Sequence, residues 1–314
     1  MVGTGDVGTL PAHNHLMRAL ITLWKFTRPH TIIGSALSVS ALYVLVLAQP
    51  GAVADHLGVW LPSLVAALAC NVFITGLNQW SDVEVDRINK PWLPIPAGLL
   101  TRDQALAIVL ASGALGLLLA AWSSPFFLGL IGVISFLGWA YSMPPIRFKR
   151  HHFGAALAIT VVRGILVNLG FYAHFTQQLE GRLALDALVW PLTAFVALFS
   201  IGIAWFKDIP DTKGDAEYRF GTLAVRLGRR SALWMGVGVV VLAYLAVLLP
   251  AAGGALPRPL WYGAAYGLSL LLFVAMAFRL DVEDNVQVKR FYLMFWGLFF
   301  LAYLVYPVPY WLAR

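Results

Sequence analysis

Long apolar runs recur along almost the whole chain, and polar residues collect in short stretches between them. Because a helix needs about 20 apolar residues to cross the hydrocarbon layer of a bilayer, we interpret nine of these runs as membrane helices. Their predicted spans are 31–48, 59–80, 103–121, 125–143, 154–175, 186–206, 231–250, 260–278 and 291–312. Turn-forming residues near Pro50, Pro125 and Gly253 suit tight turns between antiparallel helices. The pattern predicts an all-α integral membrane fold in one domain, with an N-terminal arm over 1–23 and a core over 24–314.

The amino-acid composition supports this class of protein. Of the 314 residues, 60% are hydrophobic and 12% are charged, and the mean hydropathy is +0.77. A soluble protein carries about twice that charged fraction, so the apolar residues are too numerous for one water-soluble core. The single cysteine, Cys70, excludes an internal disulfide and a thiolate metal cage, and we expect it to be a small buried packing residue.

Lysine and arginine gather on one side of the predicted membrane. Eighteen of the 22 basic residues fall in the N-terminal arm or in the loops after the second, fourth, sixth and eighth helices. Cytoplasmic loops carry such an excess, so we predict that the N-terminus and these loops are cytoplasmic. The first 20 residues lack a basic segment followed by an apolar one, and we expect the first membrane helix to be its own insertion signal. The net charge of +7 then reports topology and argues against nucleic-acid binding.

A polar column extends the second membrane helix. Asn78, Asp82 and Asp86 are spaced i, i+4, i+8, so a continued helix places them on one face. Two carboxylates and an amide oxygen are the hard ligands that Mg²⁺ prefers, and Mg²⁺ shares its remaining positions with water and phosphate oxygens. Glu84 points elsewhere and is predicted to pair in solvent with Arg87 or Lys90.

A second acidic segment follows the sixth helix. It contains Asp208, Asp211 and Asp215, and Pro210 and Gly214 favour one helical turn or a bent segment over a continuous helix. Either acidic segment alone is also compatible with acids that cap helices at the lipid headgroups. Asp208 follows Asp82 by 126 residues with four crossings between them, which suggests two four-helix pseudo-repeats plus a ninth helix.

Two acidic segments that face each other can hold two Mg²⁺ ions bridged by a diphosphate. A diphosphate also requires fixed cations and hydrogen-bond donors. The stretch "YSMPPIRFKR" after the fourth helix supplies these groups on the same side of the membrane, although the positive-inside bias explains part of its charge. The predicted diphosphate-binding residues are Arg28, Tyr141, Arg147, Lys149, Arg150 and Lys207.

These motifs resemble those of the UbiA-type intramembrane prenyltransferases, and within that superfamily the homogentisate prenyltransferases of the tocopherol pathway. The resemblance is carried by "RPHTIIGSALSV" (28–39), "GLNQWSDVEVDRINKPWLP" (76–94), "AYSMPPIRFKR" (140–150), "VRGILVNLGFYAHF" (162–175), "FKDIPDTKGD" (206–215) and "FYLMFWGLFFLAYLVYP" (291–307). The second superfamily motif is often two acids four apart, which Asp211 and Asp215 match. Asp208 is an additional acid, so which of the three bind metal is left open.

The resemblance implies a fold and a reaction. Nine helices surround a central cavity that opens sideways to the lipid bilayer. A prenyl diphosphate, phytyl or geranylgeranyl, alkylates homogentisate with loss of the carboxyl group, which gives a methyl-prenyl-benzoquinol. Magnesium and the cations stabilise charge on the departing diphosphate. The membrane would be a bacterial plasma membrane or an internal photosynthetic membrane.

Several residues are candidates to position the acceptor or to shield the allylic cation. Arg163 lies inside a membrane helix, where a charge is costly and usually functional. The alternative for Arg163 is a buried ion pair with an acid of either segment. The remaining candidates are Asn168, His30 and His174 and the aromatic residues Trp80, Tyr141, Phe171 and Tyr172, each of which has packing as its alternative role.

Other functions share parts of this pattern. Esterification of chlorophyllide and prenylation of 4-hydroxybenzoate use the same metal–diphosphate chemistry with another acceptor. A membrane transporter is compatible with nine crossings and an intramembrane charge. Transporters, however, place ionisable groups near the midplane of the membrane, whereas these acids lie at one membrane face beside a basic loop.

Overall fold

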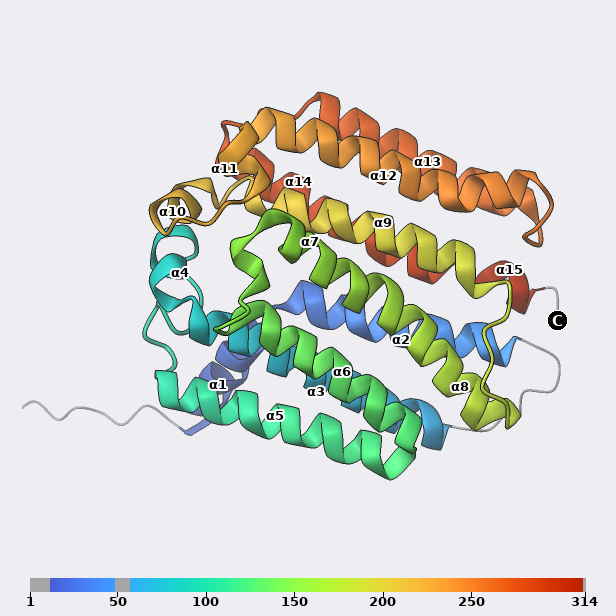
Figure 1. Cartoon of the computed structure of the whole chain (residues 1–314), viewed down its shortest axis with the longest axis horizontal. Coiled ribbons are helices and arrows are strands. Elements are labelled where there is room, and N and C mark those ends of the chain that lie inside the picture. Colours follow the sequence, from blue (N-terminus) through green and yellow to red (C-terminus); the bar gives the residue numbers. More distant parts are fainter. Residues whose placement is uncertain (1–11, 49–56, 313–314) are drawn as a thin grey trace, which may run out of the picture.

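The computed structural model describes residues 12–48 and 57–312, and all of its regular elements are helices. The long helices lie side by side in Figure 1, and the short helices α4, α10 and α11 gather at one end of the bundle. The first half comprises α1 (Ala12–Phe26), α2 (Pro29–Leu47), α3 (Leu57–Ser81), α4 (Val83–Asn89), α5 (Arg102–Ser123), α6 (Pro125–Ser142) and the 3₁₀ turn η1 (Phe148–Arg150). The second half comprises α7 (His152–Ile159), the π-helix η2 (Thr160–Gly170), α8 (Phe171–Glu180), α9 (Val189–Asp208), α10 (Thr212–Glu217), α11 (Leu223–Leu227), α12 (Arg229–Ala252), α13 (Pro259–Phe278), α14 (Asn285–Val305) and α15 (Val308–Trp311).

Among the described residues, nine helices are long and apolar enough to cross a membrane, which confirms the predicted number. α7, η2 and α8 together form the fifth span, Phe153–Glu180, and α14 with α15 forms the ninth, Asn285–Trp311. The predicted turn near Pro50 and residues 1–11 of the predicted N-terminal arm lie outside the described residues.

Side-chain hydrogen bonds determine where some of the membrane helices begin. Thr101 accepts from the backbone N–H of Gln104, whose side chain accepts from the Thr101 N–H, and this capping box starts α5. The carboxylate of Asp284 accepts from two backbone N–H groups of the first turn of α14. α14 therefore begins six residues before the predicted span 291–312. A hydropathy pattern does not detect the first turn of this helix because it contains polar residues.

The fifth span contains the one π-helical segment found in the described part of the chain. Such segments are rare and are frequent at functional sites. The Asn168 amide donates to the carbonyl oxygens of Arg163 at 3.0 Å and Gly164 at 2.8 Å, which satisfies two backbone acceptors of this wide turn. Gly164 lies against α9, where an added Cβ would come within 2.5 Å of the Ala197 Cα. η2 therefore approaches α9 more closely than a larger residue would allow.

Helix pairs repeat across the two halves of the chain. α3 packs along α5, and α9 packs along α12 in the same manner. Each of α3 and α9 is followed by a short helix, α4 or α10, and these two short helices contact each other. The arrangement agrees with two four-helix units followed by a ninth helix, and it brings the ends of α3 and α9 together at one end of the bundle (Figure 1).

Candidate active site

The first acidic segment stands almost as predicted. α3 ends at Ser81 and α4 begins at Val83, yet the backbone bonds from Asp82 to Asn78 (3.1 Å) and from Asp86 to Asp82 (2.8 Å) continue the helical ladder. The Asn78 amide donates to the Asp82 carboxylate at 3.0 Å, so its carbonyl oxygen is the atom left for a metal. The helical ladder therefore keeps these three oxygen-bearing side chains on one side.

The second acidic segment is bent, as the proline and glycine predicted. α9 ends at Asp208 and α10 begins at Thr212, with Asp211 between them as the N-cap residue. The backbone N–H of Asp215 donates to Asp211 at 3.1 Å, which gives one helical turn between these two acids. All three carboxylates are buried to more than nine-tenths of their residue surface.

Asn89 and Lys90 join the two acidic segments. The Asn89 amide donates to the Asp215 carboxylate at 3.4 Å and accepts from the Gly214 backbone N–H at 3.0 Å. The Lys90 ammonium bonds to Asp211 and lies 4.0 Å from Asp86, so it bridges the two segments. An added Cβ at Gly214 would lie 2.5 Å from the Asn89 side-chain oxygen, so a larger residue there would displace Asn89 from this position.

Neither of these two roles was predicted. Glu84 pairs with Arg87 at 2.6 Å on the exposed side, which confirms the prediction for Glu84 and leaves Lys90 to the acids.

Cations from the other half of the site approach the same carboxylates. The Lys149 ammonium lies 2.7 Å and the Arg147 guanidinium 3.2 Å from Asp82. The Lys207 ammonium lies 3.6 Å from Asp208 and donates to the Tyr141 hydroxyl at 2.7 Å. The pairs of Arg147 and Lys149 with Asp82 bring the basic loop after α6 against the acidic column, on the membrane face where the sequence predicted that loop.

Of the two remaining predicted cations, Arg28 lies in the site and Arg150 does not. Arg28 lines the cavity between the acidic segments, and its buried Nε has no partner among the described residues. Arg150 is exposed and its side chain does not line this cavity, so it is not part of the group that the fold brings together.

Burial shapes the charge of this site. Burial raises the pKa of Asp86 to about 6, and burial together with the charges of Asp208 and Asp211 raises the pKa of Asp215 to about 8. Burial also lowers the pKa of the Lys149 ammonium to about 8, against the attraction of Asp82. The cavity thus contains both buried carboxylates and a buried ammonium group. Such a set of charges is complementary to a divalent cation bound together with a diphosphate.

The donor set fits magnesium that arrives with a phosphate ligand. Among the described residues no three His, Cys, Asp or Glu side chains form a ready-made metal cage. One carboxylate oxygen of Asp86, Oδ2, is buried without a hydrogen-bond partner. Mg²⁺ usually uses one or two carboxylates and completes its shell with water and phosphate oxygens, so two separate acidic segments suit it better than a closed cage would.

The site continues into a second cavity inside the bundle. The charged cavity lies between the acidic segments and is lined by Asp82, Asp86, Lys90, Lys149, Asp208, Asp211 and Asp215, among others. The intramembrane cavity is lined by side chains of α2, α3, α6, η2 and α14, which include many apolar residues, polar residues of α2 and α3, and Arg163. Six residues line both cavities and so form the passage between them: Arg28, His30, Asn78, Tyr141, Lys207 and Tyr292.

A charged end joined to an apolar chamber is the arrangement that a diphosphate with a hydrocarbon tail requires. A model of the UbiA prenyltransferase family matches residues 37–312, which is most of the chain. The chain belongs to the UbiA prenyltransferase family. This confirms the resemblance that the motifs indicated.

Known proteins support this assignment along the whole chain. The chain is 38% identical over 307 residues to homogentisate phytyltransferase from Synechocystis sp., an alignment that covers 95% of this chain and 98% of the relative. It is 35% identical to homogentisate geranylgeranyltransferase from Triticum aestivum, over 92% of this chain and 72% of the relative. The structure of a UbiA homolog from Archaeoglobus fulgidus bound to GPP and Mg²⁺ matches with a TM-score of 0.65 and 16% identity, over 92% of this chain and 99% of that one. At that identity the structural likeness concerns the fold.

Arg163 of this UbiA prenyltransferase lines the intramembrane cavity. No acid lies within ion-pair distance of it among the described residues. Its guanidinium lies over the rings of Trp296 and Phe299, 4.9 Å and 5.6 Å from the ring centroids. His30 lies beside the same Trp296, with ring centroids 5.0 Å apart in an edge-to-face arrangement. The cavity therefore contains a cation held by aromatic faces and open to an anionic ligand.

Other candidates lie outside both cavities. Asn168 is fully buried, and it accepts from the Tyr303 hydroxyl at 2.8 Å while its amide bonds to η2, so it orients η2 against α14. The His174 ring stacks on Phe127 and bonds to Ser63 at 2.9 Å. Trp80 lies under the Arg102 guanidinium, 4.8 Å from ring centroid to Cζ.

Three further predictions concern single side chains near the intramembrane cavity. Phe171 lines it, whereas Tyr172 donates to Asp186 at 2.7 Å and does not line it. Cys70 is buried, as predicted, and its thiol lies 3.4 Å from the Ser135 hydroxyl at the cavity wall.

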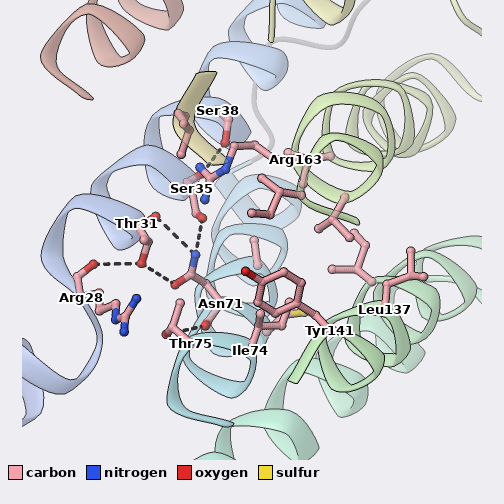
Figure 2. A pocket seen from close by; sticks show the side chains of 18 of the residues that line it. Arg28, Thr31, Ser35, Ser38, Asn71, Ile74, Thr75, Leu137, Tyr141 and Arg163 are labelled. Atoms are coloured by element: carbon pink, nitrogen blue, oxygen red, sulfur yellow. Dashed lines mark hydrogen bonds between the residues drawn. The ribbon is translucent and has the colours of Figure 1, made fainter. Parts of the chain in front are cut away.

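Sequence reasoning missed a polar wall of the intramembrane cavity. Thr31, Ser35 and Ser38 on α2 and Asn71 and Thr75 on α3 all line it (Figure 2). The signal was available in the spacing, because i, i+4 and i+7 residues share a helix face. The first three residues have that spacing, and Asn71 and Thr75 stand at the same intervals before Asn78.

Proposed function

We propose that this protein transfers a prenyl group, specifically phytyl, from a prenyl diphosphate to homogentisate in a Mg²⁺-dependent reaction. The product is a methyl-prenyl-benzoquinol for the synthesis of tocopherol or a prenylquinone. The observation that carries the proposal is the passage of the charged cavity into an intramembrane cavity that contains Arg163. The relatives from Synechocystis sp. and Triticum aestivum, which are named for the transfer of phytyl and geranylgeranyl groups to homogentisate, support the acceptor.

The charged cavity binds the diphosphate in this proposal. Lys149, Lys207 and Arg28 supply positive charge around it, and the Tyr141 hydroxyl, already bonded to Lys207, lies at the mouth of the intramembrane cavity. Asn78, Asp82 and Asp86 on one side and Asp208, Asp211 and Asp215 on the other would hold Mg²⁺, as two ions, and the bound metal would supply Lewis-acid stabilisation of the leaving diphosphate.

The intramembrane cavity receives the hydrocarbon chain and the acceptor. When the C–O bond to the diphosphate breaks, the allylic cation forms among apolar side chains that exclude water, near the rings of Tyr141 and Tyr292. The Arg163 guanidinium binds the acceptor carboxylate. The electron-rich ring attacks the allylic carbon, a C–C bond forms, and the ring loses a proton. The side chain loses CO₂ and takes up a proton to become a methyl group, and diphosphate is released.

Orientation follows from the basic residues. The charged cavity is lined by Lys149 of the basic loop after α6. Because cytoplasmic loops carry an excess of basic residues, we place this end of the bundle and the N-terminus on the cytoplasmic side. The membrane is a bacterial plasma membrane or an internal photosynthetic membrane.

The decisive experiment measures product formation with defined substrates. Membranes that contain the protein are incubated with phytyl diphosphate, Mg²⁺ and labelled homogentisate, and the labelled prenylated quinol is quantified. Parallel reactions replace homogentisate with chlorophyllide or 4-hydroxybenzoate, and replace phytyl with geranylgeranyl diphosphate. Product from homogentisate is expected to dominate. Product from another acceptor only would overturn the proposed acceptor, and solute transport with no release of diphosphate in any reaction would overturn the enzyme.

A further inference from the structure

Two polar stripes line the intramembrane cavity from neighbouring membrane helices. On α2 the stripe consists of Thr31, Ser35 and Ser38, and on α3 it consists of Asn71 and Thr75. Polar side chains within membrane spans are costly and usually have a functional reason. None of these five residues contacts the acids of the charged cavity through a hydrogen bond within the described structure. A separate explanation is therefore required for them.

Asn71 is the centre of the hydrogen bonds between the two stripes. Its amide nitrogen donates to the Ser35 hydroxyl at 2.9 Å, and its amide oxygen accepts from the Thr31 hydroxyl at 3.0 Å. Figure 2 shows Asn71 at the cavity wall between these two residues, with Arg163 extending from η2 toward Ser35 and Ser38. These bonds fix the amide so that its oxygen and nitrogen keep defined positions.

The network retains hydrogen-bonding capacity on its cavity side. Ser35 receives a hydrogen bond from Asn71, and its own hydroxyl proton has no acceptor among the described residues. A carbonyl oxygen has two lone pairs, and Asn71 uses one of them for Thr31. The pair therefore offers one donor and one acceptor at the wall, which is the complement of a hydroxyl group. Thr75 and Ser38, by contrast, donate to backbone carbonyls of their own helices at 2.8 Å and 2.9 Å.

We infer that Asn71 and Ser35 form a hydroxyl-binding subsite for the aromatic acceptor, a ring with phenolic hydroxyls and an acidic side chain. This inference rests on the proposed function. With Arg163 on the carboxylate and Asn71 with Ser35 on a ring hydroxyl, the acceptor is held at two points. Two fixed points orient the ring and so select which ring carbon faces the allylic carbon.

The position of the subsite along the membrane agrees with this geometry. Asn71 precedes Asn78 by seven residues on α3, which is about two helical turns or roughly 10 Å along the axis. Asn78 lines both cavities and marks the passage to the diphosphate end. The interval leaves room for an aromatic ring between the subsite and the bond that breaks.

The test separates hydroxyl recognition from carboxylate recognition by ligand truncation. Binding of homogentisate, phenylacetate (no ring hydroxyl) and methylhydroquinone (no carboxylate) is measured by calorimetry in detergent, with Mg²⁺ and inorganic diphosphate present. For Asn71→Leu we expect the affinities for homogentisate and methylhydroquinone to fall roughly 5- to 10-fold, because one hydrogen-bonded pair is lost. The affinity for phenylacetate is expected to be unchanged.

Complementary variants guard against a general loss of structure. Arg163→Met should lower the affinity for homogentisate and phenylacetate and leave the affinity for methylhydroquinone unchanged. Ser35→Ala should lower the same affinities as Asn71→Leu, by a smaller factor. The control is Ser63→Ala, a buried serine on α3 that bonds to His174 away from the cavities, for which all three affinities should stay as in the wild type.

Three results in Asn71→Leu and Ser35→Ala would overturn the inference. These are an equal loss of affinity for all three ligands, a loss of affinity for phenylacetate alone, or no change in any of the three affinities. If Asn71→Leu fails to fold, Ser35→Ala and Asn71→Ser decide by the same pattern. Failure of the proposed function looks different, because wild-type protein would then bind none of the three ligands while Mg²⁺ and diphosphate still bind.

Discussion

The charged cavity and the intramembrane cavity use hydrogen bonds in opposite ways. In the charged cavity most partners are distant in the sequence, as in the bonds of Asn89 to Asp215 and Lys149 to Asp82. In the intramembrane cavity most hydroxyls bond to carbonyls of their own helix, as Thr75 and Ser38 do. The first cavity is assembled by charge from several elements, whereas the second satisfies most of its hydroxyl groups within their own helices and leaves Arg163, Asn71 and Ser35 with capacity for a ligand.

This difference separates two tasks. A cavity built from opposite charges suits a highly charged ligand whose leaving requires electrostatic stabilisation. A cavity whose hydroxyl groups are mostly satisfied within their own helices costs less to keep empty in a membrane, and it discriminates between acceptors by the groups that remain available. We therefore expect changes in the charged cavity to abolish turnover, and changes in the intramembrane cavity to alter the choice and affinity of the acceptor.

Removal of the divalent metal should have the largest effect. With excess EDTA we expect activity to fall to background, because no protein cation reaches both acidic segments with the charge of Mg²⁺, and added Mg²⁺ should restore it. The measurement is the rate of quinol formation. Homogentisate binding, followed by calorimetry without the donor, should change less than about threefold in EDTA; abolition of that binding would show that the two cavities do not act separately.

Neutralisation of single acidic residues should have the second-largest effect on turnover. Asp82→Asn, Asp86→Asn, Asp211→Asn and Asp215→Asn should each lower kcat by about 100-fold or more, a typical loss for one stabilising group at a developing charge. Diphosphate release and quinol formation should fall together, since both depend on breaking the same bond. Glu84→Gln is the matched control, because Glu84 pairs with Arg87 in solvent and should retain wild-type kcat.

Near-wild-type turnover in two of the four variants would contradict the model in which both acidic segments hold metal. Thermal unfolding must be followed in parallel for Asp82→Asn, because this substitution leaves the buried Lys149 ammonium without its carboxylate.

Loss of the intramembrane cation should affect one substrate only. Arg163→Met should raise KM for homogentisate roughly 10- to 100-fold, the cost of a charge-assisted hydrogen bond. KM for phytyl diphosphate should stay within about twofold. Steady-state kinetics with each substrate varied in turn supply the measurement. Equal increases in both KM values would mean that Arg163 supports the cavity as a whole.

Much of the charged cavity was predictable from the sequence because periodicity alone places its residues. The i, i+4 spacing of Asn78, Asp82 and Asp86 fixes a shared face, and the structure keeps it. The nine spans were predictable for a similar reason, since each must meet one physical requirement of length and apolarity. The bonds of Asn89 and Lys90 were not predictable, because they depend on the contact between the short helices α4 and α10. Asn89 and its partner Asp215 are 126 residues apart in the sequence.

The intramembrane cavity was harder to predict because it depends on helix geometry that hydropathy does not encode. Arg163 and His174 are 11 residues apart, a spacing that places both on one face of a regular α-helix. Arg163 lies within the π-helix η2, whose wider turns change the rotation per residue before His174 in α8, so Arg163 faces the cavity and His174 packs on Phe127. Asn71 and Ser35 did have a readable spacing, but their roles depend on the contact between α2 and α3.

The smallest effect should come from the contact that joins the acidic segments without contacting the substrate. Asn89→Ala removes two neutral hydrogen-bonding contacts, to Asp215 and to the Gly214 backbone, while Lys90 still bridges Asp86 and Asp211. We expect kcat to fall only roughly 3- to 10-fold, and the Mg²⁺ concentration for half-maximal activity to rise, because the segments are less well positioned relative to each other. Saturating Mg²⁺ should recover part of the loss. A loss as large as that of Asp215→Asn, with no dependence on Mg²⁺, would instead place Asn89 among the residues that contact the diphosphate directly.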